Sequence, residues 1–258
     1  MKTVTSIKKY QSYMSVIFDD EITLEIQPEL MIKYHVSLGK TIDDDIYQEL
    51  VDENLYLSCL RAGLKALKKM MTVQELTTFL NSKGYGQKVI HRVISYLIEK
   101  KYLDDFQYAK MYISLKSFQQ GPQMMNFKLT EKGVNEKLIY KALSTYNEYD
   151  VVSKLCQTKL KQMKKKTKKQ AFQTIKSQLL SKGFHLEIID AVLLESQAFY
   201  TSDEKKLLEL AYEKAYKTLH VKYTGYELEQ KLKEKLYQKG FAYEDIKSYI
   251  EQKKLHSW

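Results

Sequence analysis

A lysine-glycine pair recurs four times in this chain, at Lys83-Gly84, Lys132-Gly133, Lys182-Gly183 and Lys239-Gly240. Successive glycines are 49, 50 and 57 residues apart. Apolar residues stand eight and four positions before each glycine, and six and ten positions after it. A spacing of four places side chains on one face of a helix, so each glycine joins two helices. A period of this length is typical of stacked helical repeats, and it constrains the fold more than any other feature of the sequence.

The pattern predicts four tandem units of three helices each. In every unit the glycine joins the second helix to the third, and a less regular helix precedes them. The predicted first helices lie at about 57–68, 106–117, 151–162 and 204–219. The expected core positions are Leu76, Leu80, Ile90 and Ile94, then Met125, Leu129, Ile139 and Leu143, then Ile175, Leu179, Ile189 and Leu193, and finally Leu232, Leu236, Ile246 and Ile250.

The second helices have recognisable starts. Thr72, Thr167 and Thr224 are each followed three residues later by Glu or Gln, which is the pattern of a capping box. In the second unit Gly121-Pro122 stands at this place, and proline is well suited to the first helical position because no amide donor is needed there. We therefore expect the helix to restart at Pro122.

The N-terminal segment differs from the repeats. Apolar residues alternate over 14–18 and again over 22–26, which predicts a β-hairpin, and Val4–Lys8 is a possible third strand. The acidic run Asp43-Asp44-Asp45 is a suitable cap for a connecting helix. We predict a mainly α fold, with four three-helix repeats in an elongated, curved stack and a small β-containing module at the N-terminus. The predicted divisions are the module at 1–40, a linker helix and repeat 1 at 41–100, repeat 2 at 101–146, repeat 3 at 147–199 and repeat 4 at 200–258.

The charge is unevenly distributed. The chain carries a formal net charge of +10, but residues 1–50 carry −4, so the remainder carries +14. A basic body of this kind predicts a polyanionic partner, nucleic acid first and an acidic protein surface second. Lys8 and Lys9 interrupt the N-terminus before an apolar segment could form, and no apolar run approaches the length that spans a membrane. We expect a cytoplasmic, monomeric protein.

The sequence contains no motif that is typical of an enzyme active site. Gly39-Lys40-Thr41 resembles the end of a phosphate-binding loop, but its glycine-rich cradle is missing. The histidines are scattered without the spacing of a metal site, and Cys59 and Cys156 stand on apolar stripes, as small core residues do. The sequence predicts a protein that is not an enzyme and that has no cofactor and no metal.

The strongest local charge lies between the first and second helices of the third unit, where seven lysines occur within eleven residues. Such a run can be a solvated loop. However, the lysines repel one another, and those at the helix N-terminus oppose its positive end, so a phosphate or carboxylate partner would relieve both costs. Binding is the favoured interpretation. These candidates are Lys159, Lys161, Lys164, Lys165, Lys166, Lys168 and Lys169.

A second set of candidates follows the repeat. A lysine before each glycine is well explained as a cation at a helix C-terminus, worth about 0.3–1 kcal/mol. Their common register would nevertheless place a row of positive charge along one side, and the two arginines of the chain would stand near its start. This set consists of Lys83, Lys132, Lys182, Lys239, Arg61 and Arg92.

Three short motifs within the second unit resemble the RecX family of bacterial recombination regulators. They are YLDD-x-x-YA, GP and L-x-x-KG, set among tandem three-helix units. The N-terminal module and the four-unit body are similar to the longer Gram-positive members of that family. The motif residues are Tyr102, Leu103, Asp104, Asp105, Tyr108, Ala109, Gly121, Pro122, Leu129, Lys132 and Gly133.

The resemblance implies a non-enzymatic modulator of the RecA recombinase, active in DNA repair, recombination and the SOS response. Such proteins bind the RecA–DNA filament and mostly inhibit its ATPase, strand-exchange and coprotease activities, and they also bind single- and double-stranded DNA. This chain has Gln119, Gln120 and Gln123 around the Gly-Pro, where the family often has basic residues.

Two alternatives to a RecA regulator stay open on the residues. A three-helix unit can be a helix-turn-helix, which would make this a general DNA-binding protein without RecA contact. The helical repeats would also suit an interaction scaffold with no role on DNA.

Overall fold

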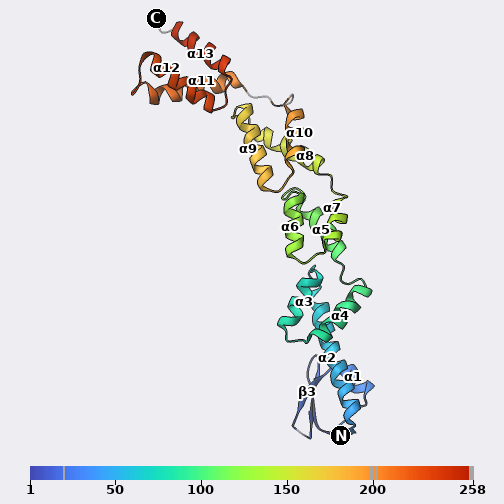
Figure 1. Cartoon of the computed structure of the whole chain (residues 1–258). Helices are drawn as coiled ribbons and strands as arrows, with labels where there is room; N and C mark the ends of the chain where they lie inside the picture. Colours follow the sequence, from blue (N-terminus) through green and yellow to red (C-terminus); the bar gives the residue numbers. More distant parts are fainter. Residues whose placement is uncertain (20, 198–199, 201–202, 256–258) are drawn as a thin grey trace. The chain divides into compact units, whose positions relative to one another are not determined.

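The computed structural model describes residues 1–19, 21–197, 200 and 203–255. Over these residues the chain forms four short strands and thirteen helices (Figure 1). It divides into two compact units. The first consists of Met1–Met111 and Leu129–Ala142, and the second consists of Tyr112–Lys128 and Leu143–Trp258. No helix in the described part of the chain is long and apolar enough to cross a membrane. The mainly helical fold with a small N-terminal sheet confirms the predicted fold class.

The N-terminal module is an antiparallel sheet covered by helices. Its strands are β1 (Lys2–Lys9), β2 (Met14–Phe18), β3 (Thr23–Ile26) and β4 (Thr41–Ile42), in the order β3-β2-β1-β4. The predicted hairpin and third strand are confirmed, because β2 pairs with both β3 and β1. Strand β4 was not predicted, since two residues are too short to show alternation. Helix α1 (Pro28–Lys33) adds Leu30 to a core that includes Phe18, Ile26 and Ile42.

Helix α2 (Asp44–Ala66) belongs both to this module and to the first repeat. Leu50, in its first half, is buried in the core of the module, and Cys59, in its second half, is buried in the core of the repeat. Asn54 fixes the helix to the chain before it, because its amide donates to the carbonyl of Glu25 at 2.7 Å and accepts from the amide of Gln27 at 2.9 Å. The predicted linker helix and first repeat helix are therefore one continuous helix.

The predicted repeat is observed in the order of the remaining helices. Repeat 1 combines the second half of α2 with α3 (Val73–Ser82) and α4 (Gln87–Glu99). Fifteen of the sixteen predicted core positions are buried, and the exception, Leu143, is half-buried beside the buried Ala142. The other repeats are α5 (Asp105–Lys116), α6 (Pro122–Glu131) and α7 (Glu136–Leu143), then α8 (Glu148–Gln162), α9 (Lys168–Ser181) and α10 (Leu186–Ser196), and finally α11 (Glu204–Leu219), α12 (Gly225–Gln238) and α13 (Tyr243–Leu255).

The four lysine-glycine pairs end the second helices in the same way. Each glycine has a positive φ, between 78° at Gly133 and 86° at Gly84, which is the left-handed conformation that L-residues avoid. The amide of the following residue bonds back to the carbonyl five residues earlier, as from Val134 to Leu129 at 3.1 Å. This is the Schellman motif, and it explains why the sequence repeats a glycine there.

The same turns also join neighbouring repeats. The hydroxyl of Thr72, at the start of α3, donates to the carbonyl of Lys132 in repeat 2 at 2.6 Å. The amide of Gly121 donates to the carbonyl of Lys182 at 2.8 Å, and the hydroxyl of Thr167 donates to the carbonyl of Lys239 at 3.0 Å. In each joint, the start of a second helix bonds to the end of the second helix in the next repeat.

An acidic residue completes the first and third joints. Asp105, the first residue of α5, accepts from the amide of Val73 at 2.9 Å, and Glu204, the first residue of α11, accepts from the amide of Lys168 at 3.1 Å. In the middle joint the corresponding amide does not exist, because the helix starts with Pro122. Glu148, the first residue of α8, instead accepts from the amide of His185 at 2.7 Å.

The three predicted capping boxes differ in outcome. Thr72 and Glu75 form a complete box, and Thr167 accepts from the amide of Gln170 at 3.3 Å. The box at Thr224 is wrong, because the Thr224 side chain makes no capping bond and Gly225 starts α12 with a φ of 54°.

A glycine in a joint should be harder to replace than one outside it. A Cβ at Gly183 would lie 2.6 Å from the amide nitrogen of Met124, whereas a Cβ at Gly84 would meet nothing within 4 Å. We expect Gly84→Ala to lower the free energy of unfolding by about 1–2 kcal/mol through its positive φ alone. Gly183→Ala should cost a further ~1–3 kcal/mol, because the backbone of the joint must move. Urea unfolding followed by circular dichroism tests this, and equal losses in the two variants would contradict the joint.

Candidate nucleic-acid interface

The seven-lysine run lies where α8 ends and α9 begins. Lys159 and Lys161 are in the last turn of α8, Lys168 and Lys169 are in the first turn of α9, and the others lie in the turn between the helices. The sequence suggested one cluster. In the structure the side chains of the run form three groups that point in different directions, and each group contacts different residues.

The first group lies along α9. The ammonium of Lys159 donates to the side-chain oxygen of Gln178 at 2.6 Å, and that of Lys166 approaches the hydroxyl of Thr174 at 3.2 Å. Gln178 and Thr174 are one turn apart on the same helix, so the two ammonium groups lie above one face of α9. Both of these partners are neutral, so these hydrogen bonds position the two ammonium groups without neutralising their charge.

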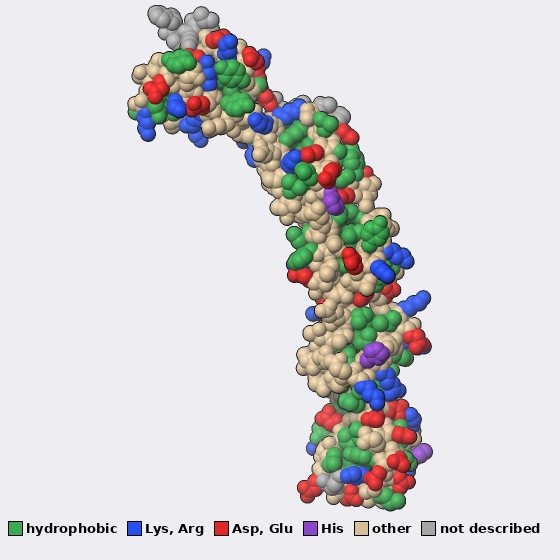
Figure 2. Space-filling model, in the orientation of Figure 1, with side chains coloured by type: hydrophobic (Ala, Val, Ile, Leu, Met, Phe, Trp, Pro, Cys, Tyr) green, Lys and Arg blue, Asp and Glu red, His purple; other side chains and the backbone are tan. Residues whose placement is uncertain are grey.

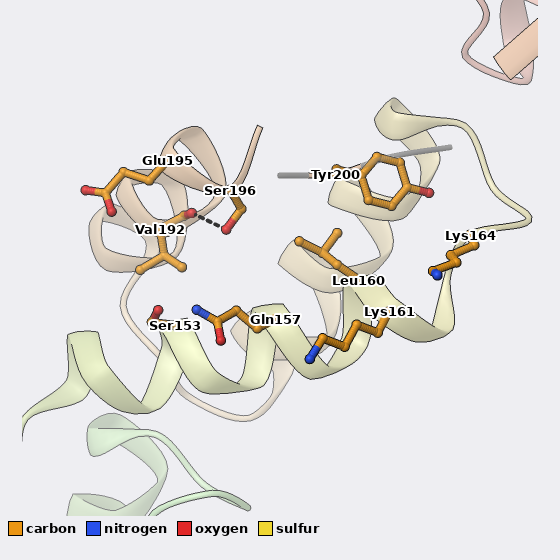
Figure 3. A pocket seen from close by; sticks show the side chains of 9 residues that line it. All are labelled: Ser153, Gln157, Leu160, Lys161, Lys164, Val192, Glu195, Ser196 and Tyr200. Carbon is orange, nitrogen blue, oxygen red and sulfur yellow. Dashed lines mark hydrogen bonds between the residues drawn. The ribbon is translucent and has the colours of Figure 1, made fainter. Parts of the chain in front are cut away.

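The second group opens onto a pocket between α8 and α10 (Figure 3). Lys161 and Lys164 are exposed and line one end of this pocket, whose volume is about 460 Å³. Tyr200 closes that end, because its hydroxyl lies 2.8 Å from the carbonyl oxygen of Met163 and 2.9 Å from that of Lys166. A ligand in the pocket would thus meet two cations beside an aromatic ring.

The third group reaches the joint between repeats 3 and 4. The ammonium of Lys169 lies 5.2 Å from the ring centre of Tyr237 on α12, while that of Lys168 lies 6.0 Å from the ring centre of Phe172. Close to this joint Lys235 approaches the hydroxyl of Thr218 at 3.2 Å. The pKa of Lys239 is lowered, first by burial and then by the positive charges of Lys214 and Lys235. We call Lys169, Lys214, Lys235 and Lys239 the basic joint.

The lysines before the glycines do not form a uniform row. In the first joint the ammonium of Lys132 is paired with the carboxylate of Glu75 at 2.5 Å, and this hydrogen bond raises the pKa of Lys132. Glu75 is the third residue of α3, and the same place is taken by Gln170 in α9. The first joint thus has a carboxylate at the position where the third joint has a neutral amide.

Other candidates of this set have local contacts. Lys83 lies 5.6 Å from the ring centre of Phe79, and the carbonyl of Lys182 accepts a bond in the middle joint. Arg61 forms an ion pair with Glu29 at 2.7 Å, which holds α1 against α2. The guanidinium of Arg92 lies 4.1 Å from the ring centre of Tyr56. Arg61 and Arg92 belong to the first compact unit, and the basic joint belongs to the second.

The short motifs that suggested the family have structural roles. Leu103, Tyr108, Ala109 and Leu129 are buried, whereas Tyr102 is exposed. Asp104 accepts from the amides of Phe106 and Gln107, as a helix cap does. The remaining motif residues, Asp105, Gly121, Pro122, Lys132 and Gly133, lie at the joints described above. The motifs therefore specify how repeats are built and joined.

The surface agrees with this distribution of charge. On the face shown in Figure 2, acidic side chains gather over the N-terminal module and lysines gather over the C-terminal repeat. Within the described residues, no three His, Cys, Asp or Glu side chains are placed to hold a metal ion. Burial raises the pKa of Cys59 and of Cys156 to about 11, so both thiols are protonated at neutral pH. Sequence reasoning missed Lys214, Lys235 and Tyr200, which only the packing brings to these sites.

Comparison with known proteins gives a consistent result. The family model for the third three-helix domain of RecX matches residues 203–250. Proteins named "Regulatory protein RecX" match almost the whole chain. The one from Oceanobacillus iheyensis is 27% identical over 261 residues, which cover 96% of both chains. The one from Bacillus licheniformis is 28% identical over 260 residues, which cover 97% of both chains.

Solved structures support the fold. A crystal structure of regulatory protein RecX matches with a TM-score of 0.57 at 16% identity, and covers 74% of this chain and 98% of its own. RecX from Lactobacillus salivarius matches with a TM-score of 0.51 at 23% identity, and covers 55% of this chain and 97% of its own. At these sequence identities the two structures support the fold and nothing beyond it. Taken together, these comparisons show that the chain is similar to proteins named regulatory protein RecX over almost its whole length, and that it shares their fold.

Proposed function

We propose that this protein regulates homologous recombination and the SOS response by binding the RecA–DNA filament and restraining its growth. The expected consequence is lower ATPase, strand-exchange and coprotease activity of RecA. The similarity to RecX proteins supports a regulator, and the motif resemblance supports RecA as the partner. Among the features of the structure, the basic joint carries the proposal, because Lys169 packs beside Gly240 at the bond between Thr167 and Lys239, and the charges that lower the pKa of Lys239 are positive.

The chemistry of these lysines suits phosphate. Lys159 and Lys166 are held by neutral groups, and Lys161 and Lys164 are exposed beside a pocket. Ammonium groups that lack a carboxylate attract the phosphates of DNA, and the release of counterions from DNA drives the binding. These lysines all lie in repeats 3 and 4. We infer that this part of the chain makes the main contact with the nucleic acid of the filament.

The direct test of the proposed function is RecA ATP hydrolysis on single-stranded DNA. Substoichiometric amounts of this protein should lower the rate, because one regulator that stops filament growth affects many RecA subunits. The experiment follows phosphate release with and without the protein, and a heat-unfolded sample serves as the control. An unchanged rate over a range that includes equimolar protein would contradict the proposal.

The contrast between the first and third joints gives a matched pair of variants. Gln170→Glu should place a carboxylate beside Lys239, as Glu75 stands beside Lys132. We expect weaker DNA binding. The slope of log K against log[salt] should become shallower by about 0.9 for each phosphate contact that is lost. Stability should be kept or raised, because the new carboxylate can also complete the capping box.

Glu75→Gln is the control for this substitution. It removes the carboxylate partner of Lys132, while a glutamine can still accept from the amide of Thr72 and keep the capping box. The free energy of unfolding should therefore fall by at most about 1 kcal/mol. DNA binding should be unchanged or stronger. Fluorescence anisotropy at several salt concentrations measures the affinities. If Gln170→Glu binds DNA as wild type does, with the same salt dependence, the basic joint is not a DNA contact.

A further inference from the structure

The pocket between α8 and α10 is not explained by the contacts with phosphate. Its volume of about 460 Å³ lies in the range of small-molecule sites. The buried side chains of Leu160 and Val192 form its apolar floor. In Figure 3, Ser153 and Glu195 lie toward one end, Gln157 lies between, and Lys161 and Lys164 lie toward the other. The full lining is Ser153, Gln157, Leu160, Lys161, Lys164, Val192, Glu195, Ser196 and Tyr200.

Several lining groups are held in place by neighbours outside the pocket. The carboxylate of Glu195 accepts a hydrogen bond from the hydroxyl of Tyr149, and the ring of Tyr200 packs edge-on against Phe172, with 5.9 Å between the ring centres. The hydroxyl of Ser196 donates to the carbonyl of Val192 at 2.7 Å. The pocket is therefore built before a ligand arrives, which lowers the entropic cost of binding.

We propose that this pocket receives one unpaired base of single-stranded DNA, with the adjoining phosphates at Lys161 and Lys164. The proposal rests on the proposed function, which brings DNA to these lysines. A nucleotide has an anionic end and a flat, neutral end with hydrogen-bonding edges. The pocket is complementary to this arrangement, since its cations lie at one end, while the amide of Gln157, the hydroxyl groups and the carboxylate of Glu195 supply hydrogen-bonding groups along the rest. Glu195 can accept from the amino group of a base or from the N3–H group of thymine, and Gln157 can both donate and accept.

The apolar floor and the ring of Tyr200 suit the faces of a base, because stacking and apolar contact are the usual means of holding unpaired bases. In duplex DNA the bases are paired and stacked within the helix, so they cannot enter. A single strand and a duplex would share the phosphate contact, and the pocket would add affinity for the single strand only. The consequence is a preference for single-stranded DNA that depends on bases and not on charge.

The test compares three probes of equal length: an oligothymidylate, an abasic single strand and a duplex. Their affinities for the full chain are measured by fluorescence anisotropy at one salt concentration. The wild-type protein should bind oligothymidylate about tenfold more tightly than the abasic strand, since stacking of one base has this magnitude. Equal affinity for the two single strands would overturn the proposal.

A pair of glutamines on α8 supplies the matched variants. Gln157 lines the pocket and Gln162 does not, and both side chains are exposed, so neither change should unfold the protein. Gln157→Leu should remove the amide that hydrogen-bonds to the base and so weaken the preference for bases, while binding to the abasic strand and the duplex stays as in wild type. Gln162→Leu should bind all three probes as wild type does. An equal loss on all three probes in Gln157→Leu would overturn the proposal.

Two further outcomes separate this inference from the proposed function. A protein that lowers RecA ATP hydrolysis and binds duplex, but does not distinguish bases from abasic sites, keeps its proposed function and loses the base pocket. If Gln157→Leu binds the three probes as wild type does but no longer inhibits RecA, the pocket is occupied by protein and the inference is wrong. Binding to none of the probes would contradict the proposed function and the base pocket together.

Discussion

The hydrogen bond between the start of one second helix and the end of the next is the interaction on which the body of this protein depends. It satisfies a free carbonyl at a helix C-terminus, with a threonine hydroxyl as donor in the first and third joints and the amide of Gly121 in the middle joint. At Gly183 the glycine also leaves room for the backbone of Met124. A sequence motif that looks functional, such as Gly121-Pro122, is therefore first of all a requirement of packing.

The joints share the lysine carbonyl as acceptor but differ in charge. Where the third helical residue is Glu75, its carboxylate pairs with Lys132 of the next repeat, and where it is Gln170, the pKa of the corresponding Lys239 is lowered by burial and by the positive charges of Lys214 and Lys235. The chain can thus place positive charge in chosen repeats without changing how the repeats are joined. The basic joint and the α8–α9 lysines occur at the joint whose third helical residue is Gln170, and the acid at that joint, Glu204, accepts from the backbone amide of Lys168.

Much of the fold could be predicted from the sequence, because its period repeats four times and each copy supports the others. Ile90, Ile139, Ile189 and Ile246 stand six residues after their glycines, and all four are buried. Strand β4 and the continuity of α2 could not be predicted, since both depend on contacts between distant residues. The site was predictable only as a charge run. Its division into three groups, and the pocket under Lys161 and Lys164, follow from side-chain directions that spacing alone does not give.

Hydrogen–deuterium exchange of this protein on the RecA–DNA filament would test the central claim most directly. The account predicts that protection from exchange appears in repeats 3 and 4, in peptides that contain Lys161–Lys169 and Lys235–Lys239, and that it is weak around the neutralised joint at Thr72 and Lys132. Protection confined to the first repeat and the N-terminal module, with repeats 3 and 4 unchanged, would contradict it.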